Sequence, residues 1–189
     1  MTRNGTTEWV KSGGVVGRGV LLDFASYAER NGLSFSAFES TVIPITLIKE
    51  VAREQGVSFR PGDILFIRCG FTKAYEKLSV QEAIALGQRP TSSFMGIESG
   101  EETLRWFWDN QFAAVAGDAV AVESSPVQGE QIPQEWSIHQ WCLAGWGMPL
   151  GEMFNLEKLA AYCNEKKRWS FFFSSMPLHV SSSYLGVAG

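Results

Sequence analysis

Hydrophobic and polar positions follow two different periods in the first third of this chain. Residues 15–23 (VVGRGVLLD) are apolar and β-branched with small breaks at Gly17 and Gly19, which predicts a strand that approaches another backbone closely or contains a bulge. After Pro44, residues 47–54 place apolar side chains on one face and charged side chains on the other, which predicts a helix that ends at Gly56. The short apolar run 64–67 (ILFI) follows a turn and indicates a strand covered on both faces.

The same alternation continues in the rest of the chain. A modest helical pattern covers residues 81–86, and Ser99 with Glu102 has the spacing of a capping box, which predicts a helix that starts there. The small-residue run 113–118 predicts a strand that ends at Asp118. Further segments are predicted as a helix over 136–144, a helix capped by Asn155, and a buried strand over 169–173. Alternating strands and helices favour an α/β layer architecture.

Composition narrows the class of protein further. The 189 residues suit a single domain spanning 1–189, and 45% hydrophobic against 19% charged residues excludes a disordered chain. The net charge is −4 and the longest basic cluster is 166–168, so nucleic acid is not expected as a partner. No segment approaches the ~20 apolar residues that span a bilayer. Three widely spaced cysteines suit reduced thiols, and we therefore expect a cytoplasmic protein without a membrane partner.

Histidine is scarce, so any metal or general-base chemistry depends on His139 or His179. His139 precedes Glu152 by thirteen residues, and a helix followed by a tight return through residues 147–151 could bring the imidazole and the carboxylate together. Such a pair could bind a divalent ion or form a base with its orienting group. From spacing alone, a solvated histidine beside a strand-end glutamate is the simpler interpretation. His179 lies in a polar stretch and is expected to be solvated.

Two acids and a set of tryptophans are further candidates. Asp118 and Glu123 lie five residues apart among small residues, where they could orient metal ligands or simply be solvated at a strand end. The tryptophans could line a pocket for an aromatic substrate, but large aromatic side chains more often build a core, so the core is the expected location; they are Trp106, Trp108, Trp136, Trp141 and Trp146. The glycine-rich residues 13–19 do not form a phosphate-binding loop, since no Gly-Lys-Ser/Thr follows them.

Four segments together resemble the cyclase family that includes bacterial kynurenine formamidase and isatin hydrolase, especially its fungal branch. They are residues 13–29, 55–71, 94–123 and 138–163, and the last two carry the most specific motifs: Gly-Asp-x-x-x-x-Glu after an Ala-rich strand, and a His-to-Glu segment that continues into Asn-Leu-Glu-x-Leu. The resemblance implies a swivelling β/β/α domain, with a mixed sheet and flanking helices. It also implies metal-dependent hydrolysis of an amide or lactam.

The resemblance also assigns roles to individual residues. His139 and Glu152 match the two late metal-site residues of the family, Asp118 and Glu123 become candidate supports for the ligands, and the ion would be zinc or manganese. A small aromatic amide or lactam is the implied substrate, as for a kynurenine formamidase in tryptophan catabolism.

The chain also departs from the family pattern. The family's principal histidine-bearing metal motif lies upstream of the Gly-rich strand, and here only about a dozen residues precede that strand, so we expect an N-terminally truncated domain with an incomplete ligand set. Uncovered apolar surface in such a domain would favour a homo-oligomer. Two hypotheses remain: an enzyme whose missing ligands come from a partner chain or another site in a homodimer, or a non-catalytic remnant that binds a partner.

Overall fold

A five-stranded mixed sheet organises the molecule, with the strand order β6-β5-β3-β1-β7. The computed structural model describes residues 6–126 and 136–177. Four strands are parallel to one another, and β7 pairs antiparallel with β1. The strands of this sheet are β1 (Val15–Leu22), β3 (Ile64–Ile67), β5 (Ala114–Gly117), β6 (Leu150–Gly151) and β7 (Ser170–Ser175). The α/β class and the mixed sheet with flanking helices are confirmed.

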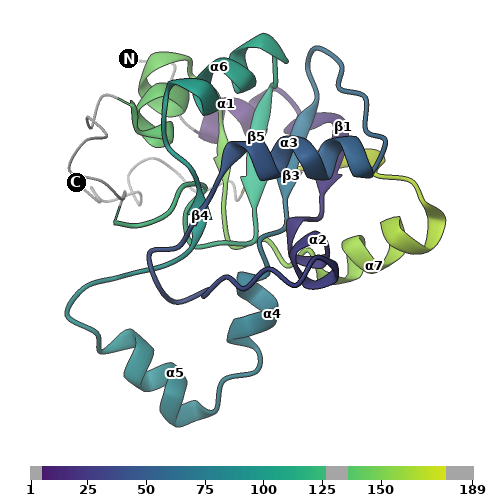
Figure 1. Cartoon of the computed structure of the whole chain (residues 1–189). Coiled ribbons are helices and arrows are strands. Elements are labelled where there is room, and N and C mark those ends of the chain that lie inside the picture. Colours follow the sequence, from purple (N-terminus) through teal and green to yellow (C-terminus); the bar gives the residue numbers. More distant parts are fainter. Residues whose placement is uncertain (1–5, 127–135, 178–189) are drawn as a thin grey trace.

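Helices cover both faces of the sheet, as Figure 1 shows. One face packs against α2 (Phe24–Arg30), α3 (Ile45–Glu54) and α6 (Glu101–Asp109). The opposite face packs against α7 (Glu157–Lys166) through a smaller apolar cluster. Successive side chains of a strand point to opposite faces, and β3 therefore contributes to both clusters and is buried along its whole length. This arrangement confirms the strand predicted over residues 64–67.

The glycine predicted to allow close approach in β1 does so against β7. Gly19 pairs with Phe171, and a Cβ added at Gly19 would lie 2.3 Å from the Phe171 ring. A side chain cannot be accommodated at that distance, so this glycine lets the Phe171 ring pack over the β1 backbone into the smaller cluster. The two strands are far apart in sequence, and this contact helps to fix their register.

A small two-stranded sheet and several short helices complete the fold. The second sheet pairs β2 (Val42–Ile43) with β4 (Gly96–Ile97) in parallel. The remaining elements are α1 (Thr6–Lys11), α4 (Phe71–Tyr75), α5 (Val80–Gly87) and the π-helix η2 (Gln140–Gly145). Figure 1 shows α5 extending away from the sheet. A capping box between Ser79 and Glu82 stabilises the start of α5. No helix in the described part of the chain is long and apolar enough to cross a membrane.

Three local expectations differ from the structure. Gly100 is the N-cap of α6 and Ser99 is buried without a hydrogen bond from its hydroxyl, so the capping box predicted at Ser99 is wrong. The helix predicted over 136–144 is largely a π-helix. The strand predicted over 169–173 exists as β7, but it is only half buried, and Phe172 is 77% exposed because β7 lies at an edge of the sheet. His179 lies outside the described residues.

Candidate functional site

Charged side chains follow the parallel strands at one edge of the sheet. Asp23 comes after β1, Arg68 after β3, Asp118 after β5 and Glu152 after β6. Because these strands run in the same direction, their carboxyl ends meet at the same edge, where open α/β sheets place their chemistry. His139 reaches this edge from the amino-terminal cap of the π-helix η2.

The structure brings His139 and Glu152 together, with Glu123 on the other side of the imidazole. Nε2 of His139 lies 3.0 Å from Oε1 of Glu152, and Nδ1 of His139 donates to Oε2 of Glu123 at 2.7 Å. Glu123 also accepts from the backbone N–H of His139 at 3.1 Å and from the hydroxyl of Ser137 at 3.0 Å. Glu123 is therefore held by three hydrogen bonds, and it fixes the orientation of the His139 ring.

The interaction between His139 and Glu123 favours the charged form of both side chains. The hydrogen bond to Glu123 raises the pKa of His139 above its ordinary value, and the negative charges of Glu123 and Glu152 add to this effect although partial burial opposes it. Burial on its own would raise the pKa of Glu123, but the side-chain and backbone hydrogen bonds from His139 lower it below its ordinary value. Glu123 is thus a carboxylate that only accepts, and Nδ1 of His139 carries a proton.

Glu152 supplies an unsatisfied oxygen at this site. Its Oε1 is buried and has no hydrogen-bond partner among the described residues, so the 3.0 Å contact with His139 is an ion-pair distance without hydrogen-bond alignment. A buried oxygen of this kind is costly unless it is paired. Two ligand atoms that bind one zinc ion tetrahedrally are roughly 3.3 Å apart, which is close to the observed separation. The pair therefore fits two ligands of a shared divalent cation.

The described residues do not complete a cation site by themselves. Within residues 6–126 and 136–177, no group of three or more His, Cys, Asp or Glu side chains is arranged to hold a metal ion. A catalytic zinc uses three protein ligands and an open position. Glu123 contacts Nδ1, on the other side of the ring from Glu152, so it supports the ligand nitrogen instead of adding a third ligand.

Asp118 accepts hydrogen bonds from the backbone of the turn that follows β3. Its two carboxylate oxygens accept from the N–H groups of Cys69 at 2.6 Å and Gly70 at 2.8 Å, in the turn that follows β3. The side chain is fully buried, and burial raises its pKa to about 6 although the two backbone hydrogen bonds oppose the shift. Asp118 joins the ends of β3 and β5 at the edge that carries His139 and Glu152. Its suggested support of metal ligands stays a prediction.

A buried ion cluster at this edge was not foreseen from the sequence. Arg68 is 4% exposed, pairs with Asp23 at 2.7 Å, and donates to both oxygens of Glu157 at 2.8 and 2.7 Å. The carboxylates of Glu157 and Asp23 raise the pKa of Arg68, even though burial lowers it. In the sequence, the available signal for this cluster was an arginine placed directly after a buried apolar run. Since the guanidinium is saturated by carboxylates, we assign it to the stability of the sheet edge.

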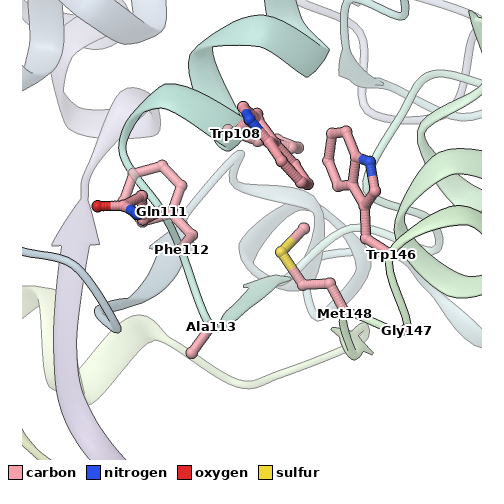
Figure 2. A pocket seen from close by; sticks show the side chains of 8 residues that line it. Trp108, Gln111, Phe112, Ala113, Trp146, Gly147 and Met148 are labelled. Atoms are coloured by element: carbon pink, nitrogen blue, oxygen red, sulfur yellow. The ribbon is translucent and has the colours of Figure 1, made fainter.

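The tryptophans do not all belong to the core. Trp108 is 61% exposed and Trp141 is 37% exposed, so the core expectation is wrong for these two. Figure 2 shows Trp108 of α6 and Trp146 beside a hollow of about 370 Å³, with Met148 between them. Met148 and Trp146 precede β6, and Ala113 precedes β5, so this hollow lies at the amino edge of the parallel strands, away from the histidine.

Comparison with known proteins identifies the family of this chain. Residues 2–124 match the model of the family described as "Putative cyclase". The chain belongs to the cyclase family. The matched residues include Asp118 and Glu123, whereas His139 and Glu152 follow the matched segment. Comparison with curated proteins gives no match.

Solved structures of cyclase type share the fold of this chain. The crystal structure of a novel cyclase is 28% identical, superposes with a TM-score of 0.70, and covers 87% of this chain and 49% of its own. Isatin hydrolase A from Labrenzia aggregata, bound to benzyl benzoate, is 14% identical with a TM-score of 0.59, covering 94% of this chain and 60% of its own. Isatin hydrolase A from Ralstonia solanacearum is 15% identical with a TM-score of 0.57, covering 88% and 55%. The cyclase-family chain thus spans about half to three-fifths of these proteins.

Proposed function

We propose that this chain contributes His139 and Glu152 to a divalent cation site, of zinc or manganese, in a hydrolase that cleaves an amide or lactam of a small aromatic compound. The observation that carries the proposal is the 3.0 Å ion-pair contact between Nε2 of His139 and the buried Oε1 of Glu152, an oxygen that accepts no hydrogen bond from the described residues. The membership in the cyclase family supports the hydrolytic chemistry, and an isatin hydrolase of the same fold has been solved with the product analogue thioisatinate.

Each residue has a defined part in this proposal. Glu123 accepts a hydrogen bond from the Nδ1–H group of His139, which leaves the lone pair of Nε2 for the cation. Glu152 provides an anionic oxygen on the same side of the ring. Lewis acidity and a lower pKa for coordinated water are the chemistry that a divalent cation supplies when bound. In the metal-free chain, a proton on Nε2 would take the place of the cation between His139 and Glu152.

The test is a binding titration of the full chain with Mn²⁺ and Zn²⁺ by calorimetry, followed by assays with formylkynurenine and isatin. We expect saturable binding that His139→Ala and Glu152→Ala each weaken. Lys158→Ala, an exposed position on α7, is the matched control and should leave binding unchanged. If neither site variant weakens the binding, or the wild-type chain binds no metal at micromolar concentration, the proposed site is wrong.

A second candidate function is a non-catalytic protein that retains the fold and binds a partner. It is favoured by one observation: within the described residues, the pair lacks a third ligand. The same experiment separates the two functions. Metal binding accompanied by hydrolysis of either substrate supports the enzyme, and metal binding without hydrolysis favours the non-catalytic protein.

A further inference from the structure

A pocket of about 160 Å³ lies where the loop 88–93 returns from α5 to β4, and Figure 1 shows this loop. We call its apolar lining the pocket floor, which comes from separate segments of the chain: Phe38, Phe71, Leu86, Phe94 and Val120. Phe71 follows β3 and Val120 follows β5, so the pocket lies at the carboxyl edge of the sheet. A cavity of roughly 150 Å³ with apolar walls holds one benzene ring. The pocket floor therefore has room for a single six-membered ring.

Aromatic side chains dominate the pocket floor. The rings of Phe38 and Phe71 meet edge to face, with centroids 5.6 Å apart and planes at 78°. Phe71 is buried, whereas Phe38 and Phe94 are only half-buried and leave part of their rings to the pocket. Phenylalanine rings pair favourably with a further ring in offset or edge-to-face arrangements. A flat aromatic ligand therefore suits this floor.

The remaining lining residues form a polar rim with one positive charge. We call Arg89, Thr91, Ser92 and Ser93 the pocket rim. Arg89 is the one charged side chain among the described residues that line the pocket. Within residues 6–126 and 136–177, the hydroxyls of Thr91, Ser92 and Ser93 make no hydrogen bond. The pocket rim thus offers unused donors and a positive charge beside an apolar floor, which favours an anionic ligand.

The guanidinium of Arg89 is held in place but is not saturated. Its Nη1 donates to the carbonyl oxygen of Phe38 at 2.6 Å and to Oε1 of Glu39 at 3.3 Å. Its Nε and Nη2 donate to none of the described residues, so their N–H groups are left for a ligand. The contact with Glu39 joins two exposed side chains, and such a pair contributes little in water. A carboxylate can therefore bind this guanidinium through two hydrogen bonds.

We propose that this pocket binds a small aromatic carboxylate, with its ring on the pocket floor and its carboxylate on Arg89. The hydroxyls of the pocket rim supply further donors to the same anion. Arg68, at the same edge of the sheet, has no such role because carboxylates of the protein already occupy its guanidinium. Neither His139 nor Glu152 lines the pocket, so the proposal does not depend on the proposed metal function.

Calorimetric titration of the full chain with benzoate in EDTA tests the proposal, and benzamide is the matched neutral ligand. Benzamide has the same ring and nearly the same shape, but it carries no negative charge. We expect saturable binding of benzoate with a dissociation constant on the order of 1 mM. Benzamide should bind at least about tenfold more weakly. Benzoate should also shift the amide NMR signals of residues 91–94.

Two variants separate anion binding from a purely structural role of Arg89. Arg89→Gln removes the charge and should weaken the binding of benzoate at least about tenfold. Glu39→Gln removes the carboxylate that competes for the same guanidinium, so it should strengthen the binding about two- to fivefold. A purely structural role of the ion pair would weaken the binding in both variants. Arg105→Gln, which breaks an exposed arginine–glutamate pair on α6, is the matched control and should leave the binding unchanged.

The proposal is overturned if the wild-type chain shows no saturable binding of benzoate up to about 10 mM. It is equally overturned if benzamide binds as tightly as benzoate, if Arg89→Gln binds benzoate as the wild type does, or if the NMR shifts lie outside the pocket. Circular dichroism checks that each variant folds. If Arg89→Gln does not fold, Glu39→Gln decides the question, because unchanged or weaker binding in that variant contradicts the proposal.

Discussion

Replacing Glu123 by glutamine changes the charge and the hydrogen bonding beside His139 but keeps a side chain of nearly the same size. The amide oxygen of the new side chain can still accept from Ser137 and from the backbone N–H of His139. The amide nitrogen then faces Nδ1 of His139, where a donor meets a donor. The variant therefore favours the neutral imidazole with its proton on Nε2, which leaves no lone pair there for a cation.

The expected magnitude follows from the one interaction that is lost. A hydrogen bond between charged groups contributes about 1.5–3 kcal/mol, and the 37% exposure of the His139 side chain places the expected loss of unfolding free energy at about 1–2 kcal/mol. Metal affinity should fall about 10- to 100-fold, as for other residues that orient a ligand histidine.

The loss should depend on pH in a defined direction. The folded-state pKa of His139 is raised, so its contribution is complete below the ordinary value of 6.5 and disappears as pH rises through the folded pKa. The folded-state pKa of Glu123 is lowered, so its contribution is complete above 4.5 and disappears as pH falls through the folded pKa. The difference between wild type and Glu123→Gln is therefore largest between these two pH values.

Urea denaturation at several pH values and an NMR titration of the His139 imidazole measure both effects. The hydrogen bond to Glu123 is the largest cause of the raised pKa, so Glu123→Gln should lower the pKa of His139 more than Glu152→Gln does. An unchanged pKa in Glu123→Gln, or a larger change in Glu152→Gln, would refute this reasoning.

Other perturbations have equally definite outcomes. Arg68→Ala leaves the buried carboxylate of Asp23 and the partly exposed carboxylate of Glu157 without their partner, and urea denaturation should show a loss of about 3–5 kcal/mol. Gly96→Ala places a Cβ 2.2 Å from backbone atoms and should lower the melting temperature sharply, whereas Gly87→Ala, where a Cβ meets nothing within 4 Å, should not. The Asp118 carboxyl should titrate near pH 6 by NMR, and because its folded pKa is raised, its contribution to stability should be lost as pH rises from about 4 through 6.

The central strands were predictable because their sequence signals do not depend on distant residues. The strand over residues 64–67 is a short apolar run between turns, and its boundaries in the structure are those predicted. The helix after Pro44 was predictable from its two-faced pattern, and it spans Ile45–Glu54. In both cases the element packs against the core, which requires apolar side chains at regular positions, and this regular pattern is visible in the sequence.

The wrong predictions concern segments whose local sequence allows more than one structure. Tertiary contacts decide which of these structures forms. Ser99 has the sequence of a cap, but the chain buries its side chain and begins α6 after Gly100. The residues of the π-helix would also suit an α-helix, and the two structures differ only in the wider turn of the π-helix. The half exposure of β7 follows from its place at the sheet edge, which no local pattern specifies.

The candidate site was predictable in part. The spacing of His139 and Glu152 allowed the contact that the structure contains, although their binding of a metal stays a prediction. The direct hydrogen bond between Glu123 and His139 could not be derived, because it depends on how residues 123 and 139 approach across an intervening segment. Arg68 could not be assigned to its carboxylates, since Glu157 lies 89 residues away.

The pairing of β1 with β7 has a consequence for how the protein forms during synthesis. β1 emerges from the ribosome before β7, one of its two neighbours, which is made only after about 150 further residues. Until then one long side of β1 has backbone groups open to pairing with another nascent chain. The pairing of this side of β1 within one chain is therefore completed only once Ser175 has been synthesised.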